Sequence, residues 1–178
     1  MWACHPFLWA IGVAVGIWAC LFGVEYRIEL KVLRTPGTVI TLTPRKRNID
    51  GTIKTPEEVH DFDPRLEHYL KVAEIVVGLA SASLVFIPTL HSTKINTCWF
   101  AFAFVMLSFT VFFGLFFMAT MTYFYEMFLF DPSSYSAGRS SMMFSTGFSG
   151  FACFALAYFV IAVQIATAYM SGTLTSTH

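Results

Sequence analysis

One apolar stretch, Cys98 to Pro132, constrains the fold of this chain more than any other feature. Its sequence, CWFAFAFVMLSFTVFFGLFFMATMTYFYEMFLFDP, meets no charge before Glu126. A bilayer core about 30 Å thick needs about 20 apolar residues at about 1.5 Å each, so a helix of this length crosses the membrane and projects beyond it. The stretch therefore predicts an integral membrane protein with one over-long helix.

Three further apolar stretches are long enough to span a bilayer. Hydrophobic residues make up 56% of the 178-residue chain and charged residues only 12%, which is far from the composition of a soluble domain. Open sheet edges are excluded from hydrocarbon because their unpaired backbone groups are costly there, and barrel strands are shorter than these stretches. We therefore expect a single domain, a bundle of four transmembrane helices with spans at about 6–24, 72–90, 97–125 and 142–170.

The soluble part of the chain is the segment 25–71 between the first two spans. Residues 25–74 hold nine of the eleven basic and nine of the eleven acidic residues. Ile28, Leu30 and Val32 alternate with charged side chains, which predicts a strand, and the Pro-Gly turn that follows leads into TVITLT, a candidate second strand. The expected fold therefore includes a small β-sheet in this loop, followed by a helical part that begins the second span near Asp63-Pro64.

Residues with catalytic or metal-binding potential are sparse. His60 and His68 form a weak metal-ligand spacing, and a solvated polar stretch explains them better. No nucleophile and base arrangement, phosphate-binding glycine loop or pair of intramembrane carboxylates occurs. We therefore expect no enzyme activity, cofactor or metal. Glu74 and Glu126 leave a membrane-embedded enzyme or proton path as an alternative interpretation, although their positions near span ends favour an interfacial role.

The four cysteines lie in or beside the apolar spans and form no CxxC or Cys/His spacing. Free cysteine behaves as a small hydrophobic residue in such surroundings. The sequence therefore indicates no disulfide framework and no metal or redox centre.

Two kinds of residue predict helix contacts inside the membrane. Small residues at four-residue spacing permit close helix approach, and packing within the bundle is the simplest interpretation for most of them. At about 100° per residue, six phenylalanines of the third span fall within an arc about 100° wide, which predicts an outward-facing stripe that meets a partner or lipid. The packing candidates are Gly12, Gly16, Gly78, Ala162 and Ala166; the partner-interface candidates are Phe102, Phe109, Phe113, Phe116, Phe117 and Phe124, with Tyr123 and Phe128 at the projecting end.

The order of these elements resembles the claudin-like superfamily of tetraspan proteins. One span is followed by a strand-rich loop and three closely linked spans, and residues 120–162 are similar in style to the third helix, second loop and fourth helix of that family. The resemblance implies a sheet continued by the third helix and a role in junctions or as an auxiliary channel subunit. The Trp and Cys signature of the family's first loop is absent, because neither residue occurs between Cys20 and Cys98. No functional residue is therefore carried over.

The basic residues bear on orientation and localisation. Segments 26–71 and 127–141 hold ten Lys and Arg, against Lys94 alone on the other side, so the positive-inside rule places the large loop in the cytoplasm or a mitochondrial matrix. The claudin topology is the reverse, and both orientations stay open. We expect a non-enzymatic auxiliary or scaffold subunit in a plasma or secretory-pathway membrane, associated with other integral membrane proteins in a hetero- or homo-oligomer and not with nucleic acid. The alternative is an accessory subunit of a large organellar complex, such as one in the mitochondrial inner membrane.

Overall fold

Four long helices make up the part of the chain that the computed structural model describes, which is residues 5–34, 62–87, 97–130 and 137–170. The helices are α1 (Pro6–Arg34), α2 (Phe62–Phe86), α3 (Thr97–Phe130) and α4 (Ala137–Met170). Each is long and apolar enough to cross a membrane. The expectation of a membrane protein built as a four-helix bundle is therefore confirmed.

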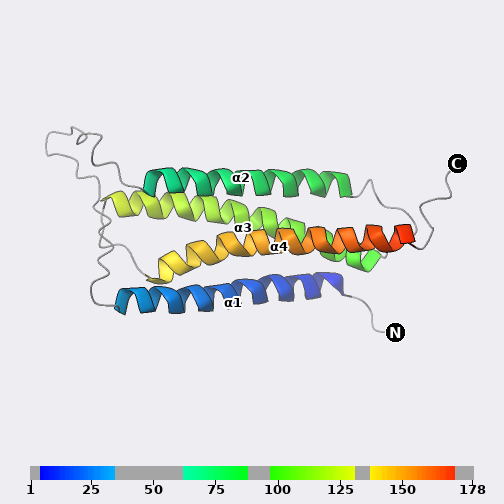
Figure 1. Ribbon diagram of the computed structural model, residues 1–178, viewed down its shortest axis with the longest axis horizontal. Helices are drawn as coiled ribbons and strands as arrows, with labels where there is room; N and C mark the ends of the chain where they lie inside the picture. The colour runs from blue at the N-terminus through cyan, green and yellow to red at the C-terminus, as the bar shows by residue number, and fades with distance from the viewer. Residues whose placement is uncertain (1–4, 35–61, 88–96, 131–136, 171–178) are drawn as a thin grey trace.

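The helices α3 and α4 form a central pair that α1 and α2 flank. Contact between α3 and α4 is the most extensive in the bundle; α1 packs against both, whereas α2 packs mainly against α3 and touches α4 at few points. Figure 1 shows α1 and α2 on opposite sides of the crossing pair. Successive helices run antiparallel, so Arg34, Phe62, Phe130 and Ala137 all mark one end of the bundle, called here the charged end.

The core joins small side chains of the outer helices to larger side chains of α3. Ala10 and Ala14 of α1 and Ala80 of α2 are fully buried, as are Met106 and Leu107 of α3. A second cluster lies nearer the charged end, where Phe117 and Met121 of α3 meet Met143 of α4. Alanine at the contacts lets the outer helices approach α3 closely, and both clusters are built on α3.

The predicted β-sheet is wrong, because the described residues contain four helices and no strand. The first helix continues without a break to Arg34, so Ile28 and Leu30 are helical. No Pro or Gly interrupts residues 24–34, and a helix that has already formed in the membrane adds further residues at little cost. Arg, Glu, Lys and Leu also favour helix. The second predicted strand and His60 lie outside the described residues.

The extension of α1 beyond the membrane span lies at the charged end, where the over-long helices α3 and α4 also project. Ser140 of α4 donates a hydrogen bond to Glu29 Oε1 of α1 at 2.8 Å. Nearer the middle of the bundle, Trp18 Nε1 donates to Thr146 Oγ1 at 3.4 Å. Side-chain hydrogen bonds therefore join α1 to α4 both in the bundle and at its charged end.

The cysteines are not all alike. Cys98, near the start of α3, is disulfide-bonded, whereas Cys20 and Cys153 are free. The sequence-based interpretation of the cysteines as small hydrophobic residues is therefore wrong for Cys98.

Candidate functional site

Three glycines set the spacing of the helices around α3. A Cβ atom at Gly114 would overlap Val77 Cγ2 of α2, and one at Gly147 would lie 2.8 Å from the Phe117 ring. At Gly150 it would lie 3.3 Å from Phe113 Cβ. Glycine therefore brings α2 and α4 close to α3, and a cavity lies beside these close contacts.

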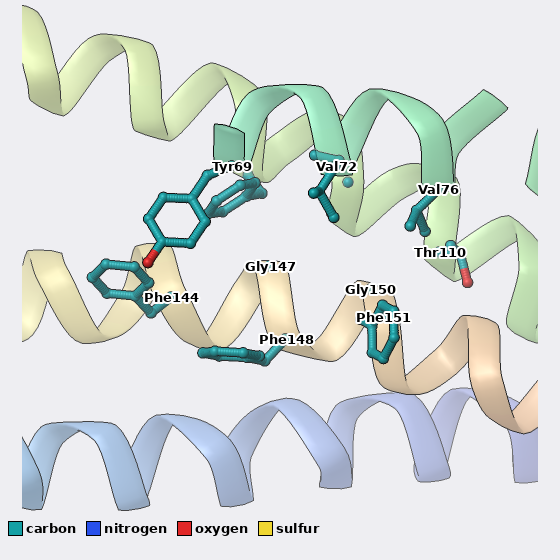
Figure 2. A pocket seen from close by; sticks show the side chains of 12 residues that line it. Tyr69, Val72, Val76, Thr110, Phe144, Gly147, Phe148, Gly150 and Phe151 are labelled. Atoms are coloured by element: carbon teal, nitrogen blue, oxygen red, sulfur yellow. The ribbon is translucent and has the colours of Figure 1, made fainter. Parts of the chain in front are cut away.

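The cavity has a volume of about 280 Å³ and lies between α2 and α4, with α3 behind it. Tyr69, Val72, Ala73 and Val76 of α2 line one side, Phe144, Phe148 and Phe151 of α4 line the other, and Thr110, Gly114, Phe117, Gly147 and Gly150 complete the lining. Figure 2 shows the tyrosine and the three phenylalanines of α4 along its length. The lining is almost entirely apolar, so the cavity suits an apolar ligand.

Two side-chain contacts join α2 to α4, one on each side of the middle of the cavity. Toward the charged end, the Tyr69 and Phe144 rings meet edge to face, with centroids 6.2 Å apart at 79°. Toward the other end, the Ser83 and Tyr158 hydroxyls hydrogen-bond to each other. The cavity lies between α2 and α4 from Tyr69 to Val76 and from Phe144 to Phe151.

Two of the residues that line the cavity carry hydroxyl groups, and these groups have different surroundings. Thr110 Oγ1 donates to the Met106 carbonyl at 3.1 Å, so its hydrogen is already used within α3. The Tyr69 hydroxyl makes no hydrogen bond with any described residue, and the Tyr69 side chain is 44% exposed. Tyr69 is therefore the donor available to a ligand.

A second surface of interest is the outward side of α1. Gly12, Gly16, Ala19 and Gly23 are all exposed, and a Cβ atom at any of the three glycines would meet nothing within 4 Å. At about 100° per residue these four positions fall within about 60°, opposite the buried Ala10 and Ala14. We call this surface the α1 glycine face. Gly12 and Gly16 therefore do not pack closely against another described helix.

The predicted aromatic stripe of α3 does not face outward as a unit. Phe113 and Phe117 are buried, while Phe102, Phe109 and Phe124 are half-buried. Phe116 and Tyr123 are exposed, and the outward aromatic face also includes Phe112, whose ring stacks on Phe116 with centroids 6.2 Å apart. Because α3 is apolar on every side, its sequence periodicity does not indicate which face is buried.

The remaining predicted residues are not brought together. Gly78 of α2 is exposed, and so are Ala162 and Ala166 of α4. Glu74 is exposed within the Glu67–Phe86 span. Glu126 and Phe128 belong to the helical part of α3, but their side chains lie outside the description. No group of three or more metal-binding side chains occurs among the described residues.

Sequence reasoning missed a row of buried hydroxyls at the start of α4. Thr146 Oγ1 donates to the Met142 carbonyl at 2.7 Å, and Ser149 Oγ donates to the Ser145 carbonyl at 2.6 Å. Ser at four-residue spacing in an apolar helix was the available signal, since such hydroxyls are satisfied by the preceding turn. These bonds let α4 carry polar residues at its contact with α3.

Together these features define a four-helix membrane protein with a lateral apolar cavity and an unpartnered glycine face. No family model, curated protein or solved structure matches the chain.

Proposed function

We propose that the protein is a non-enzymatic auxiliary or scaffold subunit that associates laterally with other membrane-spanning proteins. The observation that carries this proposal is the α1 glycine face, which is turned away from the bundle. Helix association in lipid depends on close packing rather than on a hydrophobic driving force, and small residues four apart allow a neighbouring helix to approach. Gly12 and Gly16 have this spacing, and their open surroundings leave room for a helix.

The exposed aromatic side chains of α3 support the same proposal. Phe112 and Tyr123 are each 59% exposed, and stacked rings offer a partner a rigid surface. Lipid contact alone accounts for these rings equally well, so they are secondary to the glycine face.

Replacing Gly12 and Gly16 together by Leu tests the proposal. We expect the amount of any partner that co-purifies from native membranes in mild detergent to fall at least tenfold, because two leucine side chains would fill the groove. The membrane level and the elution volume of the isolated protein should not change, since neither side chain meets the bundle. Mass spectrometry would identify and quantify the partner.

The matched control is the pair Ile11→Leu and Val24→Leu, two exposed residues of α1 beside the glycine face. This pair should leave co-purification unchanged. Undiminished co-purification of the Gly12 and Gly16 variant would overturn the role of the face. Recovery of only further copies of this chain would assign the face to self-association and remove the support for an auxiliary role.

The alternative, an accessory subunit of an organellar complex, draws support from the charge distribution. Arg27, Lys31, Lys71 and Arg139 lie at or near the charged end of the described helices, as in proteins that keep basic loops in a matrix or cytoplasm. Subcellular fractionation separates the two proposals. A mitochondrial inner-membrane signal favours the organellar subunit, whereas a plasma or secretory-pathway signal favours the auxiliary role. A claudin-like relationship stays a proposal that rests on the order of the helices.

A further inference from the structure

The cavity between α2 and α4 has the form of a slot between two rows of side chains. Tyr69, Val72 and Val76 make one row, and Phe144, Phe148 and Phe151 make the other. Residues three or four apart in a helix lie on one face, so each row runs parallel to its helix. Thr110, Gly114 and Phe117 of α3 form the back wall, with Gly147 and Gly150 of α4 beside them.

The length of the slot follows from the residues that line it. The lining runs from Tyr69 to Val76 on α2 and from Phe144 to Phe151 on α4, in each case about 10 Å at about 1.5 Å per residue. The contact between the Tyr69 and Phe144 rings lies at its charged end. The body of a ligand in the slot would therefore lie along the helices, between the two rows.

The polar end of the slot lies at the level of the membrane surface. Tyr69 follows Glu67, where the membrane span of α2 begins, and its hydroxyl lacks a hydrogen-bond partner among the described residues. Figure 2 shows the Tyr69 ring reaching from α2 toward Phe144 of α4. A ligand with one hydroxyl at its surface end and an apolar body would match this distribution of polarity.

The sequence around Tyr69 contains a pattern proposed for sterol contact. Arg65, Tyr69 and Val72 give the order basic residue, tyrosine, aliphatic residue from the membrane surface inward, and Leu66, Tyr69 and Lys71 give the opposite order. Such motifs alone are weak predictors. Here the tyrosine that both patterns share also lines the cavity, as does Val72, so sequence and structure point independently to the same place.

We propose that this slot binds a flat polycyclic lipid with a single hydroxyl group, a sterol, whose hydroxyl pairs with that of Tyr69 and whose rings lie against Phe148 and Phe151. An acyl chain loses rotational freedom on ordering, whereas fused rings are already rigid, so a sterol loses less entropy when it binds. This site is separate from the α1 glycine face.

Photolabelling of the purified full-length protein in phosphatidylcholine vesicles tests the proposal. The probe is a cholesterol analogue with a diazirine on its ring system, and labelled residues are located by mass spectrometry. We expect saturable labelling within residues 69–76 or 144–151. Excess cholesterol should compete, whereas its 3α-hydroxy epimer should compete at least threefold less well, since the hydroxyl would point away from Tyr69.

Two variants separate the site from general partition into the bilayer. Tyr69→Phe should weaken labelling about three- to tenfold, the effect of one lost hydrogen bond, while Tyr123→Phe, at an exposed tyrosine near the same end of the bundle, should not change it. Val76→Phe should abolish labelling by filling the slot, with an unchanged gel-filtration profile as its folding control. If that variant does not fold, the epimer and Tyr69→Phe still decide the matter.

Three results would overturn the proposal. Labelling that does not saturate would mean that the probe only dissolves in the bilayer. Equal competition by a free fatty acid would assign the slot to an acyl chain. Equal labelling of the native protein and the Tyr69→Phe variant, together with equal competition by both epimers, would remove the role of the hydroxyl.

Discussion

At position 141, α4 carries a hydroxyl that is fully buried and has no hydrogen-bond partner among the described residues. A buried, unpaired hydroxyl costs about 1–3 kcal/mol relative to a paired one. We therefore expect Ser141→Ala to raise the free energy of unfolding by about 1 kcal/mol, measured by thermal unfolding in detergent micelles.

The neighbouring Ser140 provides the opposite case. Its hydroxyl donates to the Glu29 carboxylate at 2.8 Å, and hydrogen bonds to charged groups contribute about 1.5–3 kcal/mol. Ser140→Ala should therefore lower the free energy of unfolding by about 1–2 kcal/mol. If the two alanine variants lose stability equally in the same assay, the Ser141 hydroxyl has a partner and the first expectation fails.

At the scale of the elements, the contact between α2 and α3 depends on Gly114. Its missing Cβ makes room for Val77, and a valine side chain in a helix has one strongly preferred rotamer and cannot turn aside cheaply. Gly114→Ala should destabilise the protein by about 1–3 kcal/mol, and adding Val77→Ala should recover at least half of that loss. A double-mutant cycle from thermal unfolding would measure the coupling.

Gly78 is the control for this contact, because a Cβ there would meet nothing within 4 Å. Gly78→Ala should be neutral or stabilising by about 0.5–1 kcal/mol, since Ala favours helix over Gly. If Gly114→Ala is equally harmless, the close approach of α2 to α3 is not as described.

The extension of α1 is a second test at this scale. Ile28→Pro should lower helical content and cost about 3 kcal/mol or more, because proline removes a helical hydrogen bond and clashes with the preceding turn. Ile28→Ala should change stability by less than about 0.5 kcal/mol, since the side chain is half exposed and Ala is a good helix former. Circular dichroism and thermal unfolding measure both. A large loss for Ile28→Ala would favour the strand interpretation.

The helices could be predicted from the sequence, but their ends and faces could not. Apolar length identifies a span, yet residues 26–33 satisfy a strand pattern and a helix pattern alike, and only continuity with α1 decides between them. Gly12 and Gly114 are both single glycines within an apolar span. Gly12 nevertheless faces away from the bundle, whereas Gly114 faces α2 and makes room for the Val77 side chain. The cavity could not be predicted, because it depends on how three helices meet.

At the scale of the whole molecule, the two ends of the bundle differ chemically. Exposed basic side chains such as Lys71 lie toward the charged end, and disulfide-bonded Cys98 lies toward the other. Basic residues are retained on the cytoplasmic side, and disulfides persist in oxidising compartments. We expect Lys71→Cys to react with a membrane-impermeant maleimide only after permeabilisation, and Thr97→Cys to react in intact cells. The reverse pattern would favour the claudin-like orientation.

The flanking positions of α1 and α2 also have a consequence for biosynthesis. Both helices leave the ribosome before α3 and α4, with which they make most of their contacts. At about 5–20 residues per second, the chain from the end of α2 to the end of α4 takes about 4–17 s to synthesise. During that interval the first two helices lie in lipid without their native neighbours, so a chain truncated before Thr97 presents quality control with two unassembled helices.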